Sequence, residues 1–260
     1  MILAIDIGNI RTTIALFCTD GTLSFQSELG TDRKLTEDQY AIAILDVFRL
    51  YGADIHSVSG AILSCVVPSM TRICTAAIHR LTGKNAMVVG PGVKTGLNIR
   101  AEVHNQLGSD IVSSAVAAAA LYPSPVIVIN SHTAVSFSYM NQNTFEGCSI
   151  MPGMGIALEA LSSNGAQLPH ISMGSVESPL GRNTVDSMRA GIIYGYAGAF
   201  DRLIEELELA SGAPAAAVVI TGENFPELFR HCKHSIVYDH DLLVNGLYRI
   251  YVKNTEKNRH

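Results

Sequence analysis

The feature that most constrains the fold is a strand–turn–strand pattern that occurs twice in the chain. The first copy runs from Ile2 to Phe17, and two apolar segments flank the turn Gly8-Asn9. The second copy runs from Val126 to Tyr139, and its polar turn is Asn130-Ser-His132. Strand-like and helix-like segments alternate after each copy, which is typical of α/β domains. The pattern predicts either two ordinary hairpins or two domains with a common βββαβα plan that face each other across a cleft.

We place the domain boundary between residues 1–114 and residues 115–260, because the strand pattern restarts shortly after residue 115. The chain of 260 residues has room for two domains of ordinary size. Its 48% hydrophobic and 16% charged residues exclude an intrinsically disordered chain, which needs the opposite balance.

The charge and the cysteines indicate the compartment and exclude some partners. A net charge of −5 argues against nucleic-acid binding, which requires a basic face. No apolar segment approaches the roughly 20 residues that a membrane-spanning helix needs. The 5 cysteines are odd in number and form no Cys-x-x-Cys pair, as in proteins with reduced thiols. We expect a cytoplasmic protein without a nucleic-acid or membrane partner.

Two carboxylates lie at the ends of predicted elements, one at the end of a strand and one at the start of a helix. Asp6 lies at the tip of the first strand, where a carboxylate binds Mg²⁺ while the turn approaches a polyphosphate, or forms an Asx-type turn. Asp110 opens a predicted helix that ends near Leu121. It either interacts with the helix dipole or accepts a proton from a substrate hydroxyl in phosphoryl transfer.

Two weaker patterns have structural alternatives. His231 and His234, followed by residues 239–241 (Asp-His-Asp), could supply zinc ligands or belong to a solvated loop. Gly191 and Gly195 are spaced for close helix packing, as at a dimer interface. The chain contains neither a Gly-x-Ser-x-Gly motif nor a Walker loop, which removes two common classes of enzyme.

Several motifs occur together in one order along the chain. They are Asp6-Ile-Gly-Asn9, Ser64-Cys-Val-Val-Pro68, Val89-Gly-Pro-Gly-Val-Lys-Thr-Gly-Leu97, Gly108-Ser-Asp110, Thr133-Ala134, Ile150-Met-Pro-Gly-Met-Gly155, Gly181-Arg-Asn-Thr184 and Gly191-Ile-Ile-Tyr-Gly-Tyr-Ala-Gly198. In these motifs the chain resembles the type III pantothenate kinases, which belong to the acetate kinase, sugar kinase and actin-like superfamily. The order and spacing nearly match the family and cover almost the whole chain.

The resemblance implies a fold, a reaction and partners. The fold is α/β, with two ribonuclease-H-like domains of the actin-like ATPase superfamily and a cleft between them. The reaction transfers the γ-phosphate of ATP to pantothenate and yields 4'-phosphopantothenate, the first step of coenzyme A biosynthesis. It uses Mg²⁺ with ATP and a monovalent cation, K⁺ or NH₄⁺, in a cytoplasmic homodimer.

The resemblance also implies site residues. The ATP-binding residues are Asp6, Ile7, Gly8, Asn9, Ile10, Arg11, Thr12, Thr13 and Thr133. The substrate-binding residues are Gly108, Ser109, Asp110, Ile111 and Thr184, and Asp110 is the catalytic proton acceptor. The metal ligands are Asp6 for Mg²⁺ and Asn130 for the monovalent cation.

The chain departs from the family at several of these positions. Ile111 replaces an arginine that would pair with the substrate carboxylate, and a charge-assisted hydrogen bond of that kind contributes about 1.5–3 kcal/mol. Asn130 replaces an aspartate, and His132 replaces a glycine. Ala-Glu-Val-His at residues 101–104 stands for Tyr-x-Asn-Pro, and Ile10-Arg11 stands for Thr-Asn.

In addition, residues 221–223 read Thr-Gly-Glu where the family has Thr-Gly-Gly. These changes leave three hypotheses open. The chain is a working pantothenate kinase, a kinase for another small hydroxyl compound, or a catalytically impaired member. An impaired member would act as a binding or regulatory subunit, for example in a mixed dimer with an intact homologue.

Overall fold

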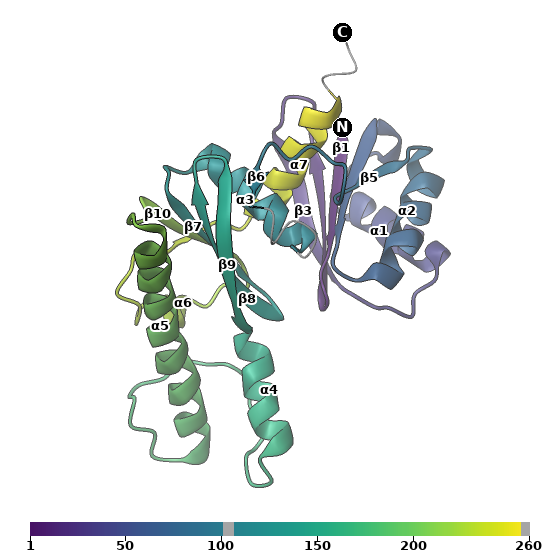
Figure 1. Cartoon of the computed structure of the whole chain (residues 1–260). Helices are drawn as coiled ribbons and strands as arrows, with labels where there is room; N and C mark the ends of the chain where they lie inside the picture. The colour runs from purple at the N-terminus through teal and green to yellow at the C-terminus, as the bar shows by residue number, and fades with distance from the viewer. Residues whose placement is uncertain (101–106, 256–260) are drawn as a thin grey trace. The chain divides into compact units, whose positions relative to one another are not determined.

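The computed structural model describes residues 1–100 and 107–255 (Figure 1). The chain forms two compact units, Met1–Ala120 with Asp241–His260 and Leu121–His240. This division differs from the expected domains 1–114 and 115–260, because the C-terminal segment returns to the first unit.

The first unit contains a mixed sheet in the order β3-β2-β1-β4-β5. The strands of this sheet are β1 (Ile2–Ile7), β2 (Arg11–Phe17), β3 (Leu23–Gly30), β4 (Gly60–Cys65) and β5 (Ala86–Val88). A further short strand, β6 (Asn98–Ile99), is not part of this sheet. Strand β2 is antiparallel to β1 and β3, whereas β4 is parallel to β1 and β5. Its helices are α1 (Glu37–Leu50), η1 (Ile55–Ser57), α2 (Pro68–Thr82), α3 (Ser109–Leu121) and α7 (Leu242–Thr255).

Strand β1 is buried on both faces, so helices cover both sides of the first sheet (Figure 1). Leu3, Ile5 and Ile7 join the cluster that contains the apolar faces of α1 and α2. Ile2 and Ala4 point to the other side and join apolar residues of α3 and α7. Because strand side chains alternate, both faces need a cover, and α7 completes the second one. This packing explains why the C-terminal helix belongs to the first unit.

The second unit repeats the plan of the first. Its strands lie in the order β11-β10-β7-β8-β9, with β8 antiparallel to β7 and β9, and β10 parallel to β7 and β11. They are β7 (Val126–Ser131), β8 (Ala134–Asn141), β9 (Thr144–Pro152), β10 (Ala217–Gly222) and β11 (Val237–Tyr238). The helices are α4 (Met154–Asn164), α5 (Thr184–Ser211) and α6 (Pro226–Phe229). Counted from the first strand of each unit, both sheets read 3-2-1-4-5, which confirms the expected duplication.

The starts of three helices are fixed by their first residues. Pro68 is the first residue of α2, with Val67 at the N-cap. Proline suits the first helical position, because its missing N–H would be unpaired there. Asn183 caps α5, since its side chain accepts a hydrogen bond from the Asp186 N–H. Thr36 and Gln39 form a capping box at the start of α1.

Two further features concern the thiols and the apolar character of the helices. All 5 cysteines are free, as expected from their number and spacing. Among the described residues, no helix is both long and apolar enough to cross a membrane.

Candidate functional site

Asp6 lies near the carboxyl end of β1, where the central strand of the first unit leaves the core. In the sheet it is paired with Thr13 of β2 and Ser64 of β4. Asp6 is only 6% exposed. The end of the apolar strand therefore places a carboxylate inside the protein and beside two hydroxyl side chains.

The surroundings of Asp6 disfavour its ionised form. Burial, as the largest cause, and the negative charge of Asp110 together raise the pKa of its carboxyl from 3.8 to about 7, although a hydrogen bond from Ser64 opposes the rise. Oδ1 of Asp6 is buried and has no hydrogen-bond partner in the described part of the chain. A buried carboxylate oxygen without a partner fits Mg²⁺, which takes hard oxygen ligands.

Asp110 is brought to Asp6 by the first turn of α3. The preceding residue, Ser109, places its Oγ 2.8 Å from the Ser64 Oγ and accepts a hydrogen bond from the Cys65 N–H at 3.1 Å. These contacts attach the N-terminus of α3 to the end of β4, the neighbour of β1. The two predicted carboxylates thus lie close enough for the charge of Asp110 to act on Asp6.

Gly108 allows the Asp110 side chain to fold back over the backbone. A Cβ at residue 108 would collide with Oδ1 of Asp110. A side chain at residue 108 would force the half-buried Asp110 carboxylate to move, so the glycine permits this position of the carboxylate. Ile111 stands where the family has an arginine. It is 8% exposed, so its side chain packs as a core residue.

The turn between β1 and β2 is the predicted phosphate loop. It closes with a hydrogen bond from the Gly8 N–H to the Arg11 carbonyl at 2.9 Å. Its tip is exposed at Asn9 and Ile10. Ile7 and Thr12 are buried, and the Thr12 hydroxyl bonds to side chains within the unit. The exposed part of the loop available to a ligand is therefore its tip.

Asn130 occupies in the second unit the place that Asp6 occupies in the first. It lies near the end of β7 and is paired in the sheet with Ser136 of β8 and Thr221 of β10. Both side-chain polar atoms of Asn130 and the Ser136 Oγ are buried without a hydrogen-bond partner among the described residues. The amide and hydroxyl oxygens fit a monovalent cation or a water, although no carboxylate supplies charge at Asn130.

The remaining predicted residues of the second unit lie near β7 or at α5. His132 packs against Gly222 (φ +91°), where a Cβ would lie 2.6 Å from the His132 Cε1. The Thr133 carbonyl accepts a hydrogen bond from the Gly153 N–H at 2.9 Å. Thr184 is exposed as the first residue of α5. The departure at residues 101–104 lies outside the described residues.

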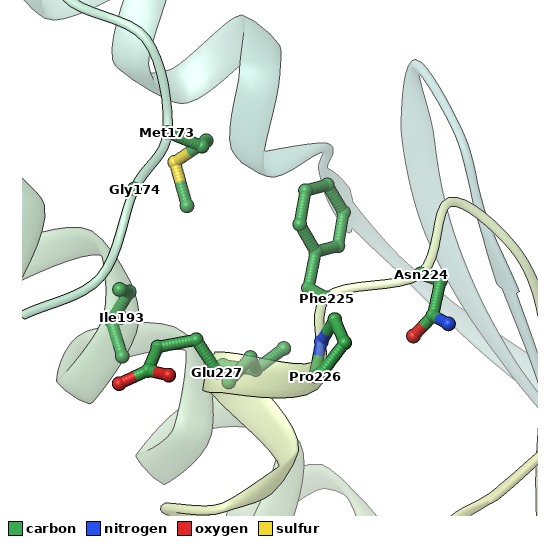
Figure 2. Close-up of a pocket in the computed structure, with 8 residues that line it drawn as sticks. Met173, Gly174, Ile193, Asn224, Phe225, Pro226 and Glu227 are labelled. Carbon is green, nitrogen blue, oxygen red and sulfur yellow. The ribbon is translucent and has the colours of Figure 1, made fainter.

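A small apolar pocket in the second unit was not predicted from the sequence. It has a volume of about 200 Å³, and Figure 2 shows Met173, Ile193 and Phe225 around it. Gly174, Asn224, Pro226, Glu227 and Leu228 complete its lining. None of the predicted site residues lines it. It is smaller than the roughly 300–1,000 Å³ of ordinary ligand pockets, so it does not support a separate ligand site.

The structure does not support the zinc alternative. His234 Nδ1 lies 2.9 Å from Oδ1 of Asp201, whose carboxylate also accepts the backbone N–H groups of Lys233 and His234. Burial acts to raise the pKa of Asp201, but these N–H groups outweigh it and lower the pKa. Among the described residues no group of at least 3 His, Cys, Asp or Glu side chains is arranged to hold a metal.

Sequence reasoning missed two contacts at the site. The Ser109–Ser64 hydrogen bond joins residues 45 positions apart. The second is a hydrogen bond from Arg33 to Asn9 across 24 positions. The only sequence signal was that Ser64 and Ser109 each lie within a motif, which does not show that they meet.

The comparison with protein families matches residues 2–206 to a family described as type III pantothenate kinase. A type III pantothenate kinase of Brevibacillus brevis is 37% identical, over 98% of this chain and 99% of that protein. One from Geobacillus thermodenitrificans is 34% identical, over 99% of each.

Solved structures share the fold at low sequence identity. One is the activator of 2-hydroxyisocaproyl-CoA dehydratase from Clostridium difficile with bound ADPNP, with a TM-score of 0.60, 9% identity and coverage of 99% of this chain and 97% of that one. Another is component A of (R)-2-hydroxyglutaryl-CoA dehydratase from Acidaminococcus fermentans, with a TM-score of 0.56, 14% identity and 96% coverage of both chains. The expected α/β fold of ribonuclease-H-like, actin-like units is confirmed.

Proposed function

The chain belongs to the type III pantothenate kinase family, and from this we propose that it transfers the γ-phosphoryl group of ATP to the hydroxyl of pantothenate. The product is 4'-phosphopantothenate, the first intermediate on the way to coenzyme A. The observation that carries the proposal is the meeting of Asp6 and Asp110 at the carboxyl end of β1.

Asp110 is the proposed proton acceptor. Phosphoryl transfer has a loose transition state, so the protein contributes mainly position and charge rather than covalent chemistry. Ser109 fixes the first turn of α3 against β4, and Gly108 leaves space for the Asp110 carboxylate. Asp110 then orients the substrate hydroxyl and receives its proton as the new P–O bond forms and the bond between the γ-phosphorus and the bridging oxygen of ADP breaks.

Asp6 is the proposed ligand of Mg²⁺. When bound with ATP, Mg²⁺ neutralises charge that develops on the phosphates. The unpartnered Oδ1 of Asp6 supports this role, because a cation would compensate the cost of the buried charge. Asn130 would offer an uncharged oxygen to K⁺ or NH₄⁺, so we expect weak binding of the monovalent cation.

The remaining assignments follow from the family motifs. The proposed ATP contacts are residues 6–13 and Thr133, and the proposed pantothenate contacts are residues 108–111 and Thr184. We also propose a cytoplasmic homodimer. The free cysteines support the location, and the exposed glycines 191, 195 and 198 of α5 support close packing of this helix against a partner.

A second candidate function rests on Ile111. This side chain is buried and apolar, so it provides no cation for the carboxylate of pantothenate. A small hydroxyl compound without a carboxylate would not require that cation. Loss of the arginine also leaves open an impaired kinase that binds without turnover.

A coupled assay of ADP release tests the proposal. The reaction contains ATP, Mg²⁺, pantothenate and either K⁺ or NH₄⁺, and mass spectrometry identifies the phosphorylated product. We expect turnover that depends on pantothenate and falls by at least about 100-fold in Asp110→Asn, in line with general-base contributions. Turnover equal to that of Asp110→Asn would refute the kinase assignment. Turnover with another hydroxyl compound alone would favour the second candidate.

A further inference from the structure

Arg33 lies beside the tip of the predicted phosphate loop. It belongs to the segment between β3 and α1, and its Nη2 donates a hydrogen bond to Oδ1 of Asn9 at 2.9 Å. The start of the same segment is attached to the loop, because the Thr31 N–H donates to the Ile10 carbonyl at 2.8 Å. Two hydrogen bonds therefore hold the segment that carries Arg33 against the turn between β1 and β2.

The charge of Arg33 is available to a ligand. Within the described residues its guanidinium forms no ion pair, and the hydrogen bond to Asn9 uses only one of its several N–H donors. Arg11, the cation within the loop itself, is paired with Glu28 at 3.0 Å. Ile10 is 56% exposed and offers no polar side-chain atom at the tip.

We propose that Arg33 is a further nucleotide-binding residue, whose guanidinium contacts the terminal phosphates of ATP at the tip of the 6–13 loop. The inference rests on the proposed function and adds to it a residue from outside the loop. A guanidinium forms paired, charge-assisted hydrogen bonds to phosphate oxygens, and Asn9 already restricts the position of this one. Such contacts act on the charged end of the nucleotide rather than on the base.

The alternative is that Arg33 only attaches the segment after β3 to the loop. Two substitutions separate the roles. Arg33→Gln keeps a side-chain N–H for Asn9 and removes the charge, whereas Arg33→Lys keeps the charge and changes the donor geometry. Lys34→Gln is the matched control, because it removes the same charge from the next, exposed residue, whose side chain forms no hydrogen bond or ion pair with the residues that the structure describes.

Calorimetric titration of the full chain with ATP and with AMP, in Mg²⁺ and without pantothenate, tests the proposal. We expect Arg33→Gln to weaken ATP binding by about 10- to 100-fold, the range typical of a hydrogen bond to a charged group. AMP binding should change less than about 2-fold, because AMP lacks the terminal phosphates. Arg33→Lys should fall between the wild type and Arg33→Gln, and Lys34→Gln should bind ATP like the wild type.

The outcomes distinguish this inference from the proposed function. Wild-type affinity for ATP in Arg33→Gln would overturn the role of Arg33 and leave the kinase assignment intact. An equal loss of ATP and AMP binding, or an equal effect of Lys34→Gln, would also overturn it. A wild-type chain that binds no ATP would overturn both.

Discussion

Replacing Asp6 with asparagine is expected to stabilise the folded chain while abolishing activity. The carboxyl is buried and its pKa rises from 3.8 to about 7 on folding. The folded state therefore holds the proton more tightly than the unfolded state, and stability falls as the pH rises between these two values. Above pH 7 the folded chain carries a buried, unpaired charge in the absence of metal.

The size of the effect follows from the shift in the pKa of Asp6. The pKa of Asp6 is about three units higher in the folded than in the unfolded chain. This difference lowers the free energy of unfolding by about 4 kcal/mol at pH 8.5 and by about 2 kcal/mol at pH 5. Asparagine removes this pH dependence. The change between the two pH values, about 2–3 kcal/mol, is the informative quantity, because any cost of burying an amide at residue 6 is independent of pH. Asn130 shows that the same fold position accepts an amide.

Urea unfolding in the presence of EDTA measures these free energies. Wild type, Asp6→Asn and the exposed control Asp46→Asn are compared at pH 5 and pH 8.5. We expect only Asp6→Asn to gain stability relative to the wild type as the pH rises. If the free energy of unfolding of Asp6→Asn differed from that of the wild type by the same amount at both pH values, the buried charge of Asp6 would not destabilise the folded chain, and the reasoning would be refuted.

Three further predictions concern neighbouring residues. Ser109→Ala removes two contacts to β4 and should lower the free energy of unfolding by about 1–3 kcal/mol and also lower kcat; unchanged values of both would contradict the positioning role. Gly108→Ala places a methyl group against the Asp110 carboxylate and should lower kcat at least about tenfold, measured by ADP release; wild-type kcat would show that Asp110 need not fold over residue 108. Asn130→Asp adds a charge beside unpartnered oxygens, so K⁺ should raise its melting temperature more than that of the wild type; equal shifts would argue against a cation site there.

The sequence predicted the repeated fold because its strongest signals are local. The first two strands of each unit have apolar segments and polar turns, and Thr36 and Gln39 form a capping box within four residues of sequence. The third strands, β3 and β9, were not placed, since many of their residues are only partly buried and the apolar signal is weak. The return of α7 to the first sheet depends on packing between distant segments, which local patterns do not encode.

The site was predicted in part for the same reason. Asp6 and Asp110 were identified from a strand tip and a helix start, and the structure brings them together. Their connection through Ser64 and Ser109 depends on hydrogen bonds between distant positions. Arg33 carries no local pattern at all, because its role depends on Asn9 being its neighbour only after folding.

The most direct test of the reaction centre is a crystal structure with pantothenate and a non-hydrolysable ATP analogue bound. We expect a carboxylate oxygen of Asp110 to lie about 3 Å from the hydroxyl of pantothenate that receives the phosphate, as general-base catalysis requires. A productively bound pantothenate whose hydroxyl faces another residue, with Asp110 beyond reach even through one water, would contradict it.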